Sequence, residues 1–224
     1  MTAQREYLIA EIEADVRLTA RELGFSKLDP RVRAALLAVP RERFVPPLER
    51  GLAYRNHPLP IGEGQTISQP YIVAIMTQLL AVGPGDRVFE LGTGSGYQAA
   101  VLAALGVEVY SVEIVPELAR RAGATLAELG YAGVHVRAGD GWAGWPEAAP
   151  FDGIIVTAAA PRLPDPLVAQ LKPGGRLVIP VGEPGGLQEL AVYRKEASGE
   201  LVGTARVPVR FVPVTGAGAA TPDP

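Results

Sequence analysis

The sequence contains no cysteine and only two histidines, His57 and His135. Without cysteine the chain can form neither disulfides nor thiolate nucleophiles, and it cannot build a zinc site on sulfur ligands. The two histidines are widely separated, and no group of His, Asp and Glu residues has the spacing typical of a metal site. We therefore expect no metal and no catalytic role for either histidine.

The chain also lacks an excess of positive charge and any long apolar run. Its formal net charge is −3 and its isoelectric point is near 5.5, so the basic footprint of proteins that bind phosphate backbones is missing. No apolar segment approaches the roughly 18 residues of a membrane helix. The first residues show no apolar core of a secretory signal. We expect a cytoplasmic monomer without nucleic-acid or membrane partners.

The length of 224 residues favours one large domain, or one domain with an extension. Apolar residues recur at helical spacing over residues 6–23, and helices are also predicted from Pro30 and over residues 69–81. The Pro- and Gly-rich stretch 54–69 between them is predicted to be a long irregular loop, and such loops are often functional. We predict a helical N-terminal extension over residues 1–80, packed on the domain that follows.

From residue 81 the pattern changes to strands that alternate with helices. Strands are predicted near residues 87–91, 107–112, 133–137, 151–156 and 175–181. This alternation indicates right-handed βαβ units and a parallel sheet covered by helices on both faces. Two last strands, near 188–194 and 205–212, follow each other without a helix and predict an antiparallel pair at one edge. Residues 216–224 are predicted to be a flexible tail.

A glycine-rich turn follows the first of these strands, with Gly92, Gly94 and Gly96 in alternate positions. Glycines let the backbone turn sharply and approach a ligand at the carboxyl edge of the sheet. Glu113 closes the next strand about 20 residues later, where a carboxylate can bind both hydroxyls of a ribose. The arrangement predicts a nucleoside-cofactor site, and a purely structural turn is the alternative.

The spacing also favours one nucleoside over another. A dinucleotide fingerprint reads Gly-x-Gly-x-x-Gly, but here the last glycine position is the bulky Tyr97. Glu90 precedes the turn, where its charge would repel a pyrophosphate and attract a cation. S-adenosylmethionine carries an ammonium and a sulfonium and no phosphate, so it fits better than NAD.

The segment 90–96, Glu-Leu-Gly-Thr-Gly-Ser-Gly, resembles the first motif of class I S-adenosylmethionine-dependent methyltransferases, and residues 151–156 and 171–177 resemble their later strand motifs. More narrowly, the segments 57–71, 139–142, 157–161 and 210–215 resemble the protein-L-isoaspartate O-methyltransferase family. The likeness runs from about Val39 to Thr215. It implies a Rossmann-like α/β fold with a seven-stranded, mostly parallel sheet, one reversed edge strand, and a methyltransferase domain over residues 81–215.

The resemblance also implies a reaction and its partners. The family transfers a methyl group from S-adenosylmethionine to the free α-carboxylate of L-isoaspartyl residues in age-damaged proteins and peptides, leaving S-adenosylhomocysteine. The methyl ester then recloses to a succinimide. A carboxylate with a pKa near 4 is already an anionic nucleophile at neutral pH, so no general base is required. Such an enzyme must align the reacting atoms and exclude water.

The family pattern assigns roles to individual residues. Ser68 is the active-site serine, whose hydroxyl orients the substrate carboxylate; a plain helix cap is the alternative. Glu90 contacts the methionine end of the cofactor, Glu113 the ribose, and Asp140 with Gly141 the adenine. The implied cofactor residues are Glu90, Gly92, Thr93, Gly94, Gly96, Glu113, Asp140 and Gly141. The implied substrate residues are Thr66, Ile67, Ser68, Ala159, Pro161, Arg210, Val212 and Thr215.

Several of these residues could instead have a purely structural role. Glu90 could pair with an arginine, Asp140 could belong to an ordinary Asp-Gly turn, and the segments 157–161 and 210–215 could be a plain loop and an edge strand. The chain also departs from some relatives, which carry a histidine shortly after the serine where this sequence has Tyr71. Any contact made by that histidine is therefore in doubt.

Three other functions compete with the repair reaction. The first is a methyltransferase for another carboxylate or small-molecule acceptor. Amine acceptors are disfavoured, because residues 157–161 read Thr-Ala-Ala-Ala-Pro where nitrogen methyltransferases resemble one another in an Asp/Asn-Pro-Pro-aromatic motif. The second is a non-catalytic nucleoside-binding module. The third is an NAD-dependent oxidoreductase, disfavoured by Glu90 and Tyr97.

Overall fold

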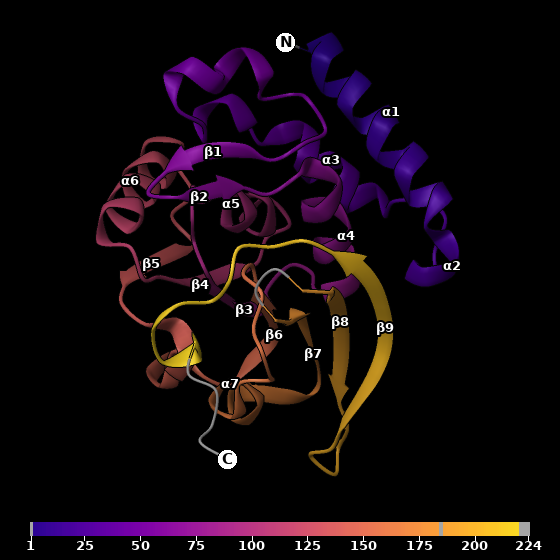
Figure 1. Cartoon of the computed structure of the whole chain (residues 1–224), viewed down its shortest axis with the longest axis vertical. Coiled ribbons are helices and arrows are strands. Elements are labelled where there is room, and N and C mark those ends of the chain that lie inside the picture. Colours follow the sequence, from indigo (N-terminus) through magenta and orange to yellow (C-terminus); the bar gives the residue numbers. More distant parts are fainter. Residues whose placement is uncertain (1, 184–185, 220–224) are drawn as a thin grey trace.

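The computed structural model describes residues 2–183 and 186–219 and contains a seven-stranded sheet covered on both faces (Figure 1). The sheet strands are β3 (Arg87–Leu91), β4 (Glu108–Glu113), β5 (Val134–Ala138), β6 (Phe151–Val156), β7 (Leu171–Gly182), β8 (Gln188–Lys195) and β9 (Leu201–Val209). Their spatial order is β5-β4-β3-β6-β7-β8-β9. This architecture confirms the predicted Rossmann-like α/β fold.

One strand of the sheet is reversed. The strands β3 to β7 pair in parallel, and β8 is antiparallel to both β7 and β9. The reversed strand therefore lies one position inside the edge, whereas we expected it at the edge itself. Two hairpin connections in succession turn the chain twice, so the outermost strand β9 again runs parallel to β7.

One face of the sheet is covered by the N-terminal helices and two later ones. These are α1 (Thr2–Leu18), α2 (Ala20–Leu23), α3 (Pro30–Ala38), α4 (Pro70–Leu80), α5 (Tyr97–Ala104) and α6 (Pro116–Glu128). Buried residues such as Ile12, Ile75 and Leu102 join Val88 and Val178 of the sheet in one hydrophobic core. The helices drawn above the sheet in Figure 1 thus share a continuous core with it.

The opposite face has a second, smaller core. Alternate residues of the same strands, such as Phe89 and Ile154, pack there against Trp142 and Leu167. This face is covered by α7 (Asp165–Gln170) and by the short 3-10 helices η3 (Gly141–Ala143) and η4 (Pro146–Ala148). The strands are buried on both sides, as parallel sheets require.

The stretch predicted to be irregular contains a β-hairpin. The strands β1 (Leu59–Gly62) and β2 (Gln65–Ile67) are antiparallel, and the tight turn between them holds Glu63 at φ 55°. Leu59, Ile61 and Ile67 point into the core while their neighbours face outward. The prediction of a structureless loop was wrong, because the prolines and glycines concealed this short alternation.

The N-terminal and C-terminal elements also differ from expectation. The helix predicted over residues 6–23 is broken at Thr19, and Gly24 ends α2 in the left-handed conformation. Between α3 and β1 lie two further 3-10 helices, η1 (Arg41–Arg43) and η2 (Pro47–Leu52). In the predicted tail, Gly216–Ala219 form the 3-10 helix η5, and residues 220–224 lie outside the described residues.

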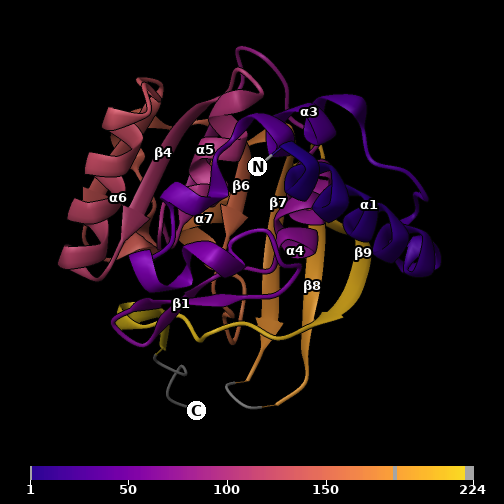
Figure 2. The same ribbon diagram turned by 90° about the horizontal axis from the view of Figure 1, so that it is seen from above.

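Two segments cross the edge of the sheet where the parallel strands end. Figure 2 shows β1 and the chain after β9 running along this edge, past the ends of β4 and β6. We call residues 210–215 the strap. Among the described residues, no helix combines the length and apolar character that crossing a membrane requires.

Candidate active site

A cleft opens at this edge, between the glycine-rich turn, the hairpin and the strap. Ligand sites of open α/β sheets lie at this edge, beyond the carboxyl ends of the strands. Among the residues that line the cleft are Thr66, Ile67, Ser68, Gly92, Thr93, Gly94, Glu113, Asp140, Gly141, Val212 and Thr215. Segments from residue 65 to residue 215 thus meet at one place, although most of them are far apart in the sequence.

The glycine-rich turn requires its glycines. Gly92, Gly94 and Gly96 all have positive φ, at 95°, 55° and 88°. A Cβ on Gly92 would collide with the hydroxyl of Thr157, and one on Gly96 would lie 3.1 Å from Leu126 Cδ1. The turn therefore packs against β6 on one side and α6 on the other. Gly96 shapes the turn from behind, since it is absent from the cleft lining.

Glu113 fixes the turn from the end of β4. Its side chain is buried, and Oε2 accepts the amide hydrogen of Gly94 at 2.7 Å, while Oε1 accepts that of Val115 at 3.0 Å. A carboxylate has about four acceptor positions, so two remain after these bonds. Glu113 is both a structural clamp and a carboxylate able to accept ligand hydroxyls at the cleft wall.

Glu90 lies behind the turn and not in the cleft. It is fully buried, and its Oε2 accepts a hydrogen bond from Ser111 Oγ at 2.5 Å; Ser111 in turn contacts Thr93 Oγ1. Burial, opposed by the hydrogen bond from Ser111 and assisted by the nearby charge of Glu113, raises the pKa of Glu90 to about 8. Among the described residues Glu90 Oε1 has no hydrogen-bond partner, so the alternative of an arginine pair is not observed.

The other end of the cleft is formed by Asp140 and Gly141. Asp140 Oδ1 accepts the amide hydrogen of Trp142 at 2.9 Å and thereby caps η3. Its Oδ2 accepts the amide hydrogen of Ala217 at 2.7 Å. A Cβ on Gly141 would lie 2.9 Å from Leu91 Cγ, so this position accepts only glycine without rearrangement. Asp140 therefore does more than close a turn, because it also anchors the chain that follows the strap.

Ser68 lies at the end of β2, on the opposite wall. The N-cap of α4 is Gln69, one residue later, and no side chain of the helix caps it. Asn56 Oδ1 accepts the amide hydrogen of Tyr71 at 3.0 Å instead. The capping role considered for Ser68 is therefore wrong. Ser68 lines the cleft, and within residues 2–183 and 186–219 its hydroxyl forms no hydrogen bond.

A broad groove adjoins the cleft at Ser68. Cleft and groove share Thr66, Ser68, Thr157 and Val212 in their linings. The groove is also lined by Pro58, Gln69, Tyr71, Ile72, Pro208, Val209, Arg210 and Phe211. Ser68 thus stands where a narrow cleft opens into a wide surface groove.

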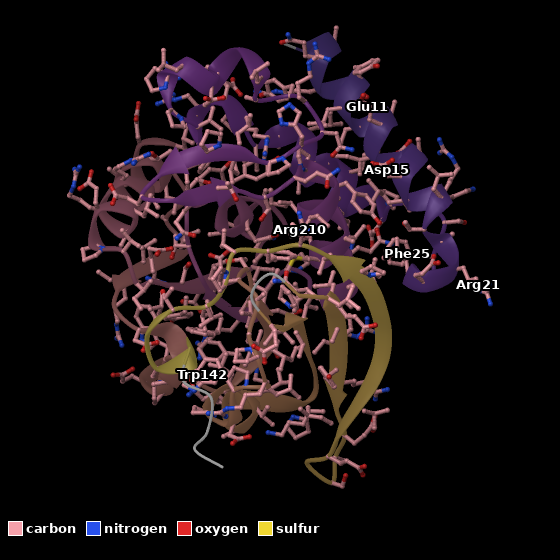
Figure 3. The ribbon with its side chains drawn as sticks, in the orientation of Figure 1. Glu11, Asp15, Arg21, Phe25, Trp142 and Arg210 are labelled. Atoms are coloured by element: carbon pink, nitrogen blue, oxygen red, sulfur yellow. The ribbon has the colours of Figure 1, made fainter. Side chains whose placement is uncertain are left out.

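The strap is held by the loop after β6. The amide of Ala159 donates to Val212 O, and the amide of Val214 donates to Ala159 O, each at 2.8 Å. Ala159 is buried by these contacts, and neither it nor Pro161 lines the cleft or the groove. Figure 3 shows Arg210 at the β9 end of the strap and Trp142 beside its other end, next to η5.

The structure also corrects and extends the predicted set. Tyr71 lies in the neighbourhood where some relatives carry a histidine. Its hydroxyl forms a hydrogen bond with Thr19 Oγ1 at 2.7 Å, which links α4 to the N-terminal helices. The cleft also contains residues outside the predicted cofactor and substrate residues and outside the segments 157–161 and 210–215: Gln65, Val73, Leu91, Ser95, Tyr97, Gln98, Val112 and Ile114. Thr157 and Ala158, of the segment 157–161, and Pro213 and Val214, of the segment 210–215, line the cleft as well. Ile114 could have been found, since it directly follows Glu113 at the strand end. Gln98 could not, because it resembles any polar residue of a helix.

The described part of the chain contains no cluster of three or more potential metal ligands. His135 is exposed and its Nε2 lies 3.3 Å from Glu108 Oε1, and His57 Nδ1 lies 3.0 Å from the carbonyl oxygen of the neighbouring Pro58. Neither histidine is among the residues that line the cleft.

Known proteins of one methyltransferase family resemble this chain over most of its length. The family model of protein-L-isoaspartate(D-aspartate) O-methyltransferase matches residues 17–219. The chain is 55% identical over 214 residues to protein-L-isoaspartate O-methyltransferase 2 of Syntrophobacter fumaroxidans, covering 96% of this chain and 87% of that protein. It is 58% identical over 184 residues to the Gloeobacter violaceus protein-L-isoaspartate O-methyltransferase, covering 82% and 89%.

Solved structures agree as well. A protein-L-isoaspartate O-methyltransferase superposes with a TM-score of 0.79 at 29% identity, covering 92% of this chain and 67% of the other. A putative enzyme of the same name from Plasmodium falciparum, in complex with S-adenosyl-L-homocysteine, shares the fold with a TM-score of 0.72 at 24% identity, over 90% and 97% of the two chains. The chain belongs to the protein-L-isoaspartate(D-aspartate) O-methyltransferase family.

Proposed function

We propose that the protein repairs age-damaged proteins and peptides by methylating the free α-carboxylate of L-isoaspartyl residues, with S-adenosylmethionine as methyl donor. The ester recloses to a succinimide, and hydrolysis of the succinimide returns some normal aspartate. The observation that carries the proposal is the position of Ser68, which lines the same cleft as the glycine-rich turn and whose hydroxyl forms no hydrogen bond within the described residues.

The cleft fits a nucleoside methyl donor. Gly92 and Gly141 both line the cleft, and at both positions a Cβ would collide with the neighbouring Thr157 or Leu91, so only glycine lets the backbone form the cleft wall there. Glu113 has acceptor capacity for two ribose hydroxyls. We assign the adenine to the end at Asp140, Gly141 and Ile114, and the methionine part to the turn at Thr93. The bound donor supplies an electrophilic methyl group on a sulfonium.

The charge of the cofactor wall suits a cation. Glu90 and Glu113 both lie at this wall, and the described residues show no ion pair of either with an arginine or lysine. Glu90 acts from behind, through Ser111 and Thr93, and not by the direct contact that the sequence suggested. An ammonium or sulfonium near the turn would favour the ionised form of Glu90.

The acceptor side suits a carboxylate on a polypeptide. The Ser68 hydroxyl can donate to a carboxylate oxygen, and Thr66 and Ile67 extend the same wall. The groove with Arg210 and Val212 is wide enough for the flanking peptide and leads to Ser68. Ala159 and Pro161 take part indirectly, since the loop that carries them holds the strap in place.

The chemistry needs positioning more than acid–base catalysis. An isoaspartyl carboxylate is ionised at neutral pH, so its oxygen can attack the methyl carbon without losing a proton to the protein. Ser68 orients that oxygen, while the hairpin and the strap enclose the cleft from two sides. Alignment of this kind can supply several kcal/mol of barrier lowering.

The test uses paired peptides that differ only in Asp or L-isoAsp at one position, with labelled S-adenosylmethionine. We expect methyl transfer to the isoaspartyl peptide and almost none to its partner. Equal labelling of both peptides, or labelling of neither, would overturn the proposed acceptor. A small-molecule carboxylate panel in the same assay tests the other acceptor class directly.

A further inference from the structure

Arg41 of η1 is a fully buried arginine, which is unusual because arginine is almost never buried without a partner. Its Nε donates to Ala53 O at 2.9 Å, and its Nη2 donates to Ser68 O at 2.8 Å. The guanidinium carbon lies 4.8 Å from the centre of the Tyr97 ring. Nη1 has no hydrogen-bond partner among the described residues.

These contacts place Arg41 between the two walls of the site. Ser68 belongs to the acceptor wall, and Tyr97 follows the glycine-rich turn and also lines the cleft. Arg41 itself comes from the N-terminal extension and lines neither the cleft nor the groove. It therefore supports the site from behind, at the backbone of the residue that we assign to the substrate carboxylate.

No carboxylate neutralises this charge within the part of the chain that the structure describes. The neighbouring Glu42 instead pairs with Arg5 and accepts a short hydrogen bond from Tyr54. The ionisable groups facing Arg41 are the phenols of Tyr97 and Tyr54, and burial lowers the pKa of Arg41 to about 10. The side chain is thus cationic at neutral pH and lacks an anionic partner.

A buried charge without a counterion costs free energy, and an apolar side chain of similar size would avoid that cost. The hydrogen bonds to the two carbonyl oxygens and the contact with the Tyr97 ring offset part of this cost. They leave Nη1 without a hydrogen-bond acceptor among the described residues. An anion bound beside Ser68 would be attracted by the guanidinium of Arg41, because Arg41 is bonded to the Ser68 backbone and charges in a protein interior are poorly screened. A carboxylate substrate is such an anion.

We propose that Arg41 is a positioning residue for the methyl transfer: it fixes Ser68 through the carbonyl oxygen and makes the acceptor side selective for an anion. This inference rests on the proposed function, because it takes the isoaspartyl carboxylate to bind beside Ser68. It assigns part of the acceptor selectivity to the N-terminal extension.

The experiment measures how much binding depends on the substrate charge. Two peptides are used, one with the isoaspartyl α-carboxylate and one with a neutral carboxamide in its place. Their Kd values are measured by calorimetry on the enzyme saturated with S-adenosylhomocysteine. We expect the wild type to prefer the acid, and Arg41→Met to reduce the acid-to-amide preference about tenfold. If Arg41 only packs against its neighbours, the substitution would weaken the binding of both peptides to the same extent.

Arg43→Met is the matched control. Arg43 lies on the same η1 helix and loses the same charge on substitution, but it is partly exposed and pairs with Glu128 at 2.6 Å. We expect its acid-to-amide preference to equal that of the wild type. An unchanged preference in Arg41→Met, or an equal loss in Arg43→Met, would overturn the inference.

Arg41→Lys covers the case in which Arg41→Met does not fold. Lysine keeps the charge but cannot bond both carbonyls and lie on the Tyr97 ring, so we expect the acid preference to persist while kcat falls about tenfold. Wild-type kcat in Arg41→Lys would contradict the positioning role. Methylation of the isoaspartyl peptide by the wild type is measured first: its absence would overturn the proposed function, whereas its presence with an unaltered preference in the variants would overturn only the role of Arg41.

Discussion

The two walls of the cleft are built in different ways. On the cofactor wall, Glu113 and Asp140 each accept two backbone amide hydrogens, and the turn is fixed against Thr157 and Leu126. On the acceptor wall, Ser68 lines both the cleft and the groove, and Arg210 is exposed on the groove. The cofactor wall is thus preorganised by hydrogen bonds and close packing, whereas the acceptor wall presents polar side chains to the cleft and the groove.

This difference predicts that the two walls can be damaged separately. Ser68→Ala removes the donor that orients the acceptor and leaves the cofactor wall intact. We expect turnover of the isoaspartyl peptide to fall at least about 100-fold, with the Kd of S-adenosylhomocysteine changed less than about twofold. Ser198→Ala, in the turn between β8 and β9, is the control for loss of a hydroxyl far from the site. Full turnover in Ser68→Ala would remove the acceptor wall from the mechanism.

Glu113→Ala damages the cofactor wall in turn. It deletes the acceptor of two backbone bonds and the proposed ribose contact, so we expect the Kd of S-adenosylhomocysteine to rise about 10- to 100-fold. Calorimetry measures this change. Glu117→Ala, four residues later and exposed on α6, should bind as the wild type does. If Glu113→Ala lowers kcat while the Kd stays the same, the ribose assignment is wrong.

The rigidity of the turn can be tested by two matched glycine substitutions. Gly92→Ala places a methyl group against the Thr157 hydroxyl at φ 95°, whereas Gly94→Ala meets only Ile61 Cδ1 at 3.7 Å and has φ 55°. We expect Gly92→Ala to lower the free energy of unfolding by about 3 kcal/mol and Gly94→Ala by about 1 kcal/mol. Denaturant titration of both variants and the wild type measures these losses. Equal losses would mean that the turn is not held against β6.

The last prediction concerns pH. Burial raises the pKa of Glu90 from 4.5 to about 8, so the folded state binds a proton that the unfolded state releases. The resulting stabilisation is fully present below pH 4.5 and is lost as the pH rises through about 8. Between these values it declines by at most about 1.4 kcal/mol per pH unit. Glu90→Gln should flatten the fall of Tm over this range; an unaltered slope would show that Glu90 does not carry the proton.

The same contrast explains what could be predicted from the sequence. The turn, Glu113 and Asp140 lie within short segments at strand ends, where the spacing of glycines and carboxylates fixes their position relative to the sheet. The hairpin was missed because Pro60, Gly62 and Gly64 read as breakers, while the buried alternation of Leu59 and Ile61 spans only a few residues. Local patterns predicted the cofactor wall, and the acceptor wall depended on the family resemblance.

Contacts between residues far apart in the sequence account for the remaining differences between prediction and structure. Arg41 reads as one arginine of a charged Pro-Arg-Glu-Arg segment, and nothing nearby in the sequence predicts that it is buried beneath Ser68. Glu90 precedes the glycines and was expected in the cleft, but its side chain points toward Ser111 of the adjacent strand. The division into residues 1–80 and 81–215 stays a prediction, and one hydrophobic core includes residues from both parts.

The most direct test is a crystal structure of the protein with S-adenosylhomocysteine. The account predicts the ribose hydroxyls within hydrogen-bond distance of Glu113 and the sulfur facing a solvent-filled space at Ser68, continuous with the groove. A ribose bound away from Glu113, or protein atoms occupying the space between the sulfur and Ser68, would contradict it.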